Sequence, residues 1–128
     1  MLGSLKIVAF VPTSDYQKAR AFYEGVLGLR FVSQDSFALV MDAHGIMIRI
    51  AKVKDLKPQQ FTILGWEVDD IEKFVSGLSE KGVEFMRFGF PGQGERGIWS
   101  APGGAKVAWF KDPDGNTLSL SQHNSTSS

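Results

Sequence analysis

Few residues in this sequence have side chains that do chemistry, and the most informative are a carboxylate and a guanidinium set in apolar strands. Glu67 follows the apolar segment that begins at Phe61, and Arg49 interrupts the apolar run 46–50. A carboxylate in an apolar cleft is suited to binding a cationic group or to acting as a general base. An inward Arg49 would favour an anionic ligand, but the sequence does not fix which side of that strand faces inward.

The histidines and the missing cysteine narrow the chemistry further. His44 falls in a predicted turn and His123 near the polar end, so we expect both at the surface rather than in a site. The absence of cysteine excludes disulfides, thiolate nucleophiles and cysteine-based zinc sites, and it fits a reducing compartment.

Length and charge limit the classes of partner. The 128 residues suit one domain, placed at 1–122, with a small polar tail at 123–128 that we leave out of the fold. Fourteen basic residues balance fourteen acidic ones, so nucleic acid and anionic membranes are not expected partners. No apolar run approaches the ~20 residues that span a bilayer, nor does the start resemble a signal peptide. We therefore expect a soluble, cytoplasmic protein.

A strand, a helix and three strands are expected in residues 5–53. Residues 6–12 are predicted to form a largely apolar strand, Asp15 to cap a helix, and Gly28 to end that helix. Strands are predicted at 29–33, 37–41 and 45–52, with a hairpin turn at 42–45.

The same order returns in residues 61–122, after a polar linker at 54–60. A strand at 61–68 leads to a helix capped by Asp69 or Asp70 and ended by Gly82, followed by strands at 83–86, 106–110 and 117–122. Asp70 stands 55 positions after Asp15, and Gly82 stands 54 after Gly28. This shared spacing indicates an internal repeat.

Three motifs resemble the vicinal oxygen chelate superfamily, which includes glyoxalases, bleomycin resistance proteins and dioxygenases. Residues 14–29 carry a Phe22-Tyr23 pair and a Leu27-Gly28 stop, residues 66–71 read Trp-Glu-Val-Asp-Asp-Ile, and residues 110–116 read Phe-Lys-Asp-Pro-Asp-Gly-Asn. The resemblance implies an α+β fold of two βαβββ modules that form a curved-sheet cleft. It also implies a homodimer, as is usual for members of this length.

The resemblance further implies a metal site, whose residues are missing here. Catalytic members hold a divalent metal with His or Glu from four strands, and counting from the motifs puts three of those positions at Val8, Ile63 and Ser119. The fourth falls near the end of the strand 45–52, among Ile48, Arg49, Ile50 and Ala51, and we assign it to Ile50. Aliphatic side chains do not bind such a cation, and serine alone is a weak ligand. We therefore expect no metal or other cofactor, and we argue against metal-dependent glyoxalase or dioxygenase activity.

If the predicted metal-ligand positions face the cleft, strand alternation indicates which other residues face it as well. The loop 88–104, with six glycines and two prolines, is suited to closing over the cleft or contacting a second subunit. Gly65 leaves room for a ligand beside the aromatic wall. The expected ligand-binding residues are Phe10, Arg49, Gly65, Glu67, Trp99, Trp109 and Ser119.

Three functions are compatible with the sequence. The first is a protein that binds and sequesters a small organic molecule in an apolar, aromatic-lined cleft without a metal, as resistance proteins do. The second is a metal-independent lyase or isomerase with Glu67 as its base. The third is a protein-interaction domain whose cleft is filled by its own aromatic side chains.

Overall fold

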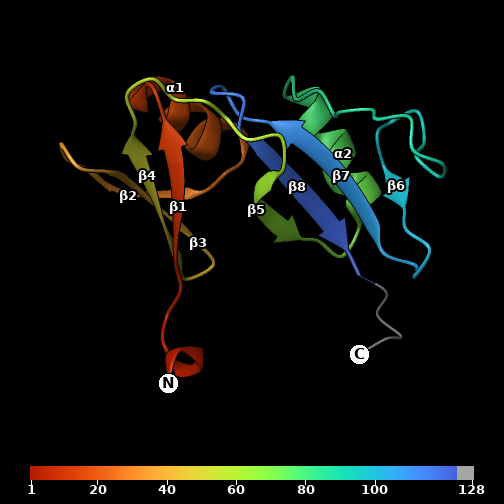
Figure 1. The fold of residues 1–128 in the computed structure, drawn as a ribbon, viewed down its shortest axis with the longest axis horizontal. Helices are drawn as coiled ribbons and strands as arrows, with labels where there is room; N and C mark the ends of the chain where they lie inside the picture. The colour runs from red at the N-terminus through yellow and green to blue at the C-terminus, as the bar shows by residue number, and fades with distance from the viewer. Residues whose placement is uncertain (124–128) are drawn as a thin grey trace. The chain divides into compact units, whose positions relative to one another are not determined.

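The computed structural model describes residues 1–123, so the predicted tail beyond His123 lies outside the described residues. The chain divides into two compact units, Met1–Lys57 and a second that begins at Pro58. This boundary falls inside the predicted linker 54–60. Each unit contains one four-stranded sheet (Figure 1).

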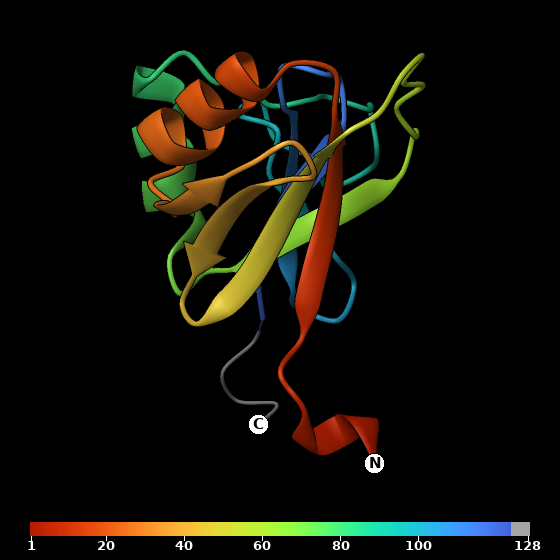
Figure 2. The same ribbon diagram turned by 90° about the vertical axis from the view of Figure 1, so that its left-hand side faces the viewer.

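The first unit begins with a short 3-10 helix, Leu2–Ser4, and strand β1, Val8–Thr13. Helix α1, Tyr16–Arg20, continues as a π-helix, Ala21–Val26, and three strands follow: β2, Arg30–Gln34; β3, Leu39–Ala43; and β4, Ile46–Lys52. The strand order is β1-β4-β3-β2, with β1 parallel to β4 and the other pairs antiparallel. In Figure 2 this sheet faces the viewer, with the helical segment at one side.

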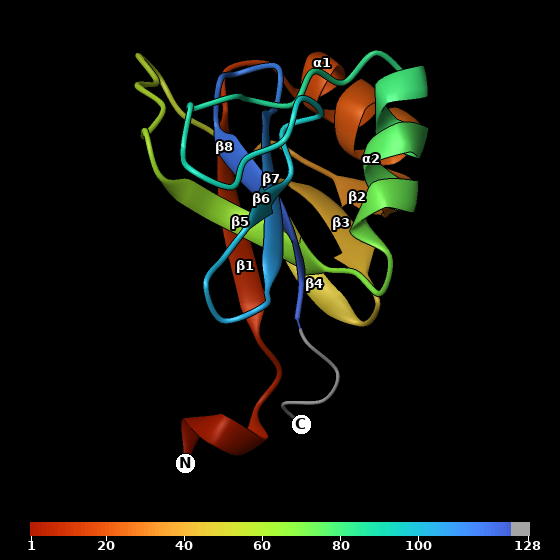
Figure 3. The same ribbon diagram turned by 90° about the vertical axis from the view of Figure 1, so that its right-hand side faces the viewer.

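The second unit repeats that plan. Strand β5, Thr62–Glu67, leads to helix α2, Ile71–Glu80, and then to β6, Trp99–Ser100; β7, Lys106–Lys111; and β8, Thr117–Gln122. The strand order is β5-β8-β7-β6, again with the first strand parallel to the last (Figure 3). The predicted α+β fold of two βαβββ modules is therefore confirmed, and so is the internal repeat.

Both helices begin at a capping aspartate. The Asp15 carboxylate accepts hydrogen bonds from the backbone N–H groups of Gln17 and Lys18, at 2.8 and 3.3 Å. In the second unit Asp70, rather than Asp69, is the cap, and it accepts from Lys73 N at 3.2 Å. These bonds satisfy amide groups that have no partner inside the helix.

The first helix differs from the regular helix that its apolar spacing predicts. Its second half is a π-helix, in which Leu27 N donates to Phe22 O at 2.9 Å, five residues back. Tyr23 lies in this wide turn and is buried, with its ring edge-on to Phe22 at 5.3 Å. Because apolar residues four or five apart can occupy the same face of a helix, the pattern did not reveal the wider turn.

The predicted strand at 83–86 is wrong. Only Phe85 forms a bridge, to Phe110, and the strand that pairs with β7 along its edge is β6, at Trp99–Ser100. The reason lies in the hydrogen bonds of this segment, because the side chain of Gln93 bonds to Met86 O and Phe88 N. The Met86 carbonyl and the Phe88 N–H group are thus satisfied by a side chain rather than by a neighbouring strand.

Each sheet buries one face against the helical segment of its own unit. In the first unit the buried residues are Val11, Leu39, Met41, Ile48 and Ile50 of the sheet with Ala19 and Tyr23 of the helices. In the second unit they are Ala108, Phe110, Leu118 and Leu120 with Ile71 and Val75. Burying a Val, Leu, Ile, Phe or Met side chain stabilises the fold by ~1.5–3 kcal/mol. Among the described residues, no helix is long and apolar enough to cross a membrane.

Candidate ligand-binding site

The candidate site residues lie on the open face of each sheet, by which we mean the face turned away from the helix of the same unit. In the first unit Phe10 is the partner of Arg49 and Val8 is the partner of Met47, so all four share one face. The Phe10 side chain is 65% exposed. The orientation that the sequence left undecided is therefore clear: Arg49 lies on the same face as Phe10.

Ile50 lies on the opposite face, which corrects its assignment as a family ligand position. It is fully buried and pairs with Val11 of β1, whereas Val8 is on the open face. Because successive residues of a strand point to opposite faces, Arg49 and Ala51 are the residues at this end of β4 that share the face of Val8.

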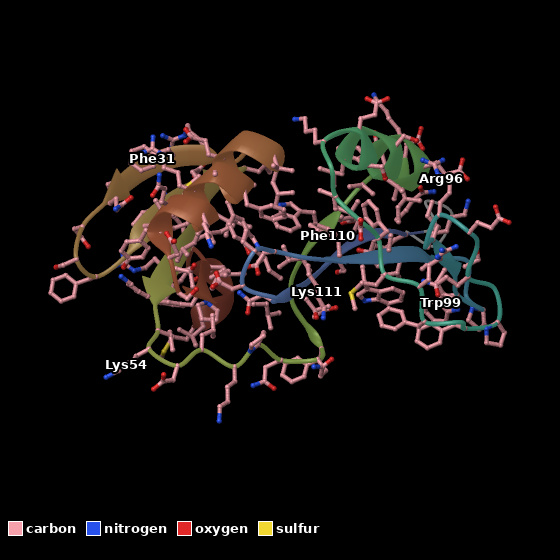
Figure 4. The ribbon with its side chains drawn as sticks, turned by 90° about the horizontal axis from the view of Figure 1, so that it is seen from above. Phe31, Lys54, Arg96, Trp99, Phe110 and Lys111 are labelled. Atoms are coloured by element: carbon pink, nitrogen blue, oxygen red, sulfur yellow. The ribbon has the colours of Figure 1, made fainter. Side chains whose placement is uncertain are left out.

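Two rows of residues cross the open face of the second sheet. Gly65, Ser119 and Trp109 are successive partners in one row. Glu67, Ser121, Val107 and Trp99 form the next. The five site residues predicted in this unit therefore occupy two adjacent rows of one face. In Figure 4, Trp99 and Lys111 lie on one side of β7, and Phe110 lies on the other side, toward α2.

The space beside Gly65 is taken by a neighbouring side chain. A Cβ atom added to Gly65 would lie 2.6 Å from Ser119 Oγ. The expectation that Gly65 leaves room for a ligand is therefore wrong, because the space left by the absent side chain is occupied by the Ser119 hydroxyl. Ile63 is the extra residue of a register shift between Thr62 and Leu64 and is half-buried.

Four aromatic rings gather on this face, and we call them the aromatic cluster: Phe88, Phe90, Trp99 and Trp109. Phe88 and Phe90 are stacked with centroids 5.1 Å apart, and both stand nearly perpendicular to Trp109, at 5.3 and 6.1 Å. The ring of Trp99 is 5.9 Å from that of Phe90 and 6.0 Å from that of Trp109. Such offset and edge-to-face contacts are the favoured geometries of aromatic pairs.

Sequence reasoning did not include Phe88 and Phe90 among the site residues. Both side chains are 43% exposed, although they contact the two tryptophans. Their alternation in a glycine-rich loop, with Trp99 in the same loop, was the available signal. The loop brings them to the sheet through contacts that no local pattern predicts.

Polar groups lie on this same face, on strands β5, β7 and β8. Glu67 is exposed at the end of β5, and its partner Ser121 has its hydroxyl 3.3 Å from Nε2 of the exposed His123. Lys111, two residues beyond Trp109, is exposed on the same face.

His44 lies in the β3–β4 turn of the first unit with a positive φ of 52° and is exposed.

The residues at the ligand positions predicted from the family resemblance do not fit a divalent metal. Val8 and Ile63 are aliphatic, Arg49 and Ala51 are the open-face residues at this end of β4, and Ser119 supplies one hydroxyl. A divalent metal is held by imidazole, thiolate or carboxylate groups. In residues 1–123 no group of three or more His, Cys, Asp or Glu side chains is placed to hold a metal ion.

Solved structures with this fold come from several bacteria. TnmS3, an antibiotic binding protein from Streptomyces sp. CB03234, is 24% identical, with a TM-score of 0.72 and coverage of 94% of this chain and 97% of that one. A fosfomycin resistance protein from Listeria monocytogenes is 15% identical, with a TM-score of 0.73 and 96% of each chain covered. A superfamily member from Sphaerobacter thermophilus is 23% identical, with a TM-score of 0.72 and coverage of 94% and 98%. At these identities the likeness concerns the fold alone.

The sequence also matches a family model directly. No curated protein matches the chain. The model of the Glyoxalase/Bleomycin resistance protein/Dioxygenase superfamily matches residues 5–120, nearly the whole length of both units. The match agrees with the repeated βαβββ plan and with the strand order of both sheets. The chain belongs to the glyoxalase/bleomycin resistance protein/dioxygenase superfamily.

Proposed function

We propose that this protein binds a flat organic molecule on the open face of its second sheet, without a metal, and sequesters it rather than transforming it. The observation that carries the proposal is the aromatic cluster. Its four rings stand on a sheet face, and Phe88 and Phe90 keep 43% of their surface exposed. A ligand that covers partly exposed aromatic rings buries their remaining apolar surface and can stack on them in a specific geometry.

The charges on this face favour an aromatic ligand over a small anion. Glu67 is on β5, in the row of Trp99, and Lys111 is on β7, beyond Trp109. One carboxylate and one ammonium group do not form the cationic cluster that tight binding of a phosphate or phosphonate requires. Most of the binding free energy would then come from covering the rings.

Two structural relatives support binding as the kind of function. One is an antibiotic binding protein and the other a fosfomycin resistance protein. Both have this fold over nearly their entire length, so a role in resistance is part of the proposal. The ligand positions Val8, Ile63 and Ser119 support the absence of a metal from that role.

Phe10 and Arg49 share the open face of the first sheet and stay predicted ligand-binding residues of that unit. We place the protein in the cytoplasm and propose a homodimer. The homodimer is supported by the family resemblance and by exposed apolar side chains on the first unit. Phe10 is 65% exposed, Val8 42% and Met47 40%. Contiguous exposed apolar surface often marks an interaction site.

The proposal is tested by a thermal-shift screen in the presence of EDTA. The panel contains flat aromatic compounds, with proflavine as the first probe, and matched non-aromatic anions such as phosphonoacetate. We expect the melting temperature to rise with aromatic compounds and to stay unchanged with the anions. If no compound of either class shifts it, the aromatic rings only fill their own face and the protein-interaction alternative is favoured.

A metal-independent enzyme is the second candidate, and one contact favours it. Ser121, the partner of Glu67, has its hydroxyl 3.3 Å from His123 Nε2, which places three groups able to move protons at one end of the aromatic face. For a lyase or isomerase with Glu67 as base, Glu67→Gln would remove turnover of a bound compound while its affinity stays unchanged. If the second candidate is wrong, no bound compound is turned over by the wild-type protein.

A further inference from the structure

We propose that Gln93 is the positioning residue of the aromatic cluster: its side-chain amide fixes the loop that carries three of the four rings. The consequence for ligand binding rests on the function proposed above. The arrangement of the rings does not rest on it, so the two can be tested separately.

The side-chain amide of Gln93 forms three hydrogen bonds with backbone groups of this loop. Its Oε1 accepts from Phe88 N at 2.7 Å, and its Nε2 donates to Met86 O and to Gly97 O, both at 3.0 Å. A glutamine amide has one carbonyl acceptor and two N–H donors. The side chain therefore joins the two limbs of the loop, residues 86–88 and residue 97.

Each ring of the loop is connected to Gln93 through the backbone. Phe88 is held directly by its N–H group. Phe90 begins a turn that Gln93 N closes by donating to Phe90 O at 3.0 Å, with Pro91 second and Gly92 third at a φ of 88°. Proline followed by a positive-φ glycine is the sequence of a type II turn.

Trp99 is connected to the same point. It forms a bridge with Gln93, and its indole Nε1 donates to Pro91 O at 3.1 Å. The fourth ring, Trp109, belongs to β7, and its carbonyl accepts from Met86 N at 2.8 Å. Met86 is itself bonded by Gln93, so the loop and the strand meet at this residue.

The loop needs such a fixed point because its sequence favours disorder. Residues 88–104 include six glycines, whose conformational entropy opposes ordering. The aromatic rings are partly exposed and so provide only part of the burial that would offset this entropy. A loop fixed before ligand binding loses less entropy on binding, which is the basis of preorganisation.

The test uses two variants of Gln93 and one control. Gln93→Met has a similar length but no hydrogen-bonding amide, so it removes all three bonds. Gln93→Glu keeps an acceptor for Phe88 N and loses both donors, which places a carboxylate beside two carbonyl oxygens. Gln60→Met, at an exposed position before β5, is the matched control.

The first readout is the circular dichroism couplet of two closely spaced indoles. In the wild-type protein we expect a couplet that Trp99→Phe abolishes and Trp66→Phe leaves in place. Gln93→Met should remove most of its amplitude, Gln93→Glu should reduce it, and Gln60→Met should leave it unchanged, with melting temperatures within about 4 °C of wild type. A couplet that Gln93→Met leaves intact, or its absence from the wild type, would overturn the proposal. So would loss of cooperative unfolding in Gln93→Met, because Gln93 would then be needed for the fold as a whole.

The second readout is binding of proflavine. If the proposed function is right, Gln93→Met should weaken binding by about tenfold, because the rings must be ordered when the dye binds. If the couplet is lost in Gln93→Met but the wild-type protein does not bind proflavine or any other flat compound, Gln93 positions the rings and the proposed function fails. If proflavine binds equally well to both proteins, the predicted effect of Gln93 on ligand binding is wrong and the proposed function stands, while the couplet alone decides whether Gln93 positions the rings.

Discussion

Trp109 is the residue on which the proposed site depends most. It lies in the row of Gly65 and Ser119 on the open face, and its ring is in contact distance of three others: Phe88, Phe90 and Trp99. Its neighbour Phe110 points to the opposite face and is fully buried. Two adjacent aromatic residues thus have separate roles, one in the core and one in the site.

Replacing Trp109 should weaken ligand binding without removing the core. We expect Trp109→Leu to reduce the affinity for proflavine about tenfold, or ~1.4 kcal/mol, through lost ring contacts. Trp66→Leu is the matched control, since Trp66 pairs with Leu120 on the opposite face. Fluorescence polarisation of the dye measures the proflavine affinity of both variants. Equal weakening by the two substitutions would show that the effect comes from general loss of stability.

At the level of residues, strand parity predicted which side chains share a face of the sheet. Alternation placed Phe10, Trp109 and Ser119 on one type of face, and the register agrees. Parity failed for Ile50, because counting located the end of its strand but not the orientation of that strand. Phe88 and Phe90 were missed because a loop has no period from which a face can be read.

The hairpin between β7 and β8 is the element whose sequence is most fully explained by its bonds. The Asp112 carboxylate is 6% exposed and accepts from the backbone N–H groups of Asp114 and Asn116, each at 2.9 Å. Its other oxygen accepts from Asn116 Nδ2 at 2.8 Å. Gly115 completes the turn with a φ of 88°.

Removing this carboxylate should destabilise the second unit. We expect Asp112→Ala to lower the free energy of unfolding by ~2–4 kcal/mol, because buried N–H groups lose a charged acceptor. Urea unfolding measures the change, with the exposed Asp69→Ala as control. A change below ~1 kcal/mol would mean that water replaces the lost bonds.

A second turn, before β3, should respond to acid. The backbone N–H groups of Phe37 and then Ala38 donate to Asp35 and hold the pKa of its carboxyl below the ordinary value of 3.8. A lowered folded pKa stabilises the turn above the unfolded pKa, and this contribution is lost as the pH falls through the folded pKa. An NMR titration of the Asp35 carboxyl should give a midpoint below 3.8. A midpoint at or above that value would contradict these hydrogen bonds.

The elements that the sequence predicted well are those with local signals. Capping aspartates, stopping glycines and the 112–116 turn all act within a few residues, and the structure confirms them. The prediction of a strand at 83–86 was wrong because the side chain of Gln93, several residues away, bonds to the Met86 carbonyl in place of a neighbouring strand. The π-helix was missed because its extra residue leaves the apolar pattern almost unchanged.

At the scale of the whole molecule, the chain consists of two units with the same strand order. In each, the first strand lies parallel to the last, and one face of the sheet packs on the helix of the same unit. The unit boundary at Lys57 falls in a polar segment. The spacing of caps and stops predicted this repeat because the fold repeats both at nearly equal intervals.

The homodimer proposed from the family resemblance is tested by sedimentation equilibrium. We expect a mass twice the chain mass of 14.1 kDa at micromolar concentration. Phe10→Ser should shift the equilibrium toward monomer if the exposed apolar side chains of the first unit take part. A single species at the chain mass over the whole concentration range would contradict the dimer.

Binding of a flat ligand without a metal can be measured by a calorimetric titration of EDTA-treated protein with proflavine. We expect saturable binding with a fixed stoichiometry per chain, unchanged by added Zn²⁺, Ni²⁺, Mn²⁺ or Fe²⁺ and weakened in Trp109→Leu. Binding that appears only after a metal is added, or tight binding of one metal per chain, would contradict it.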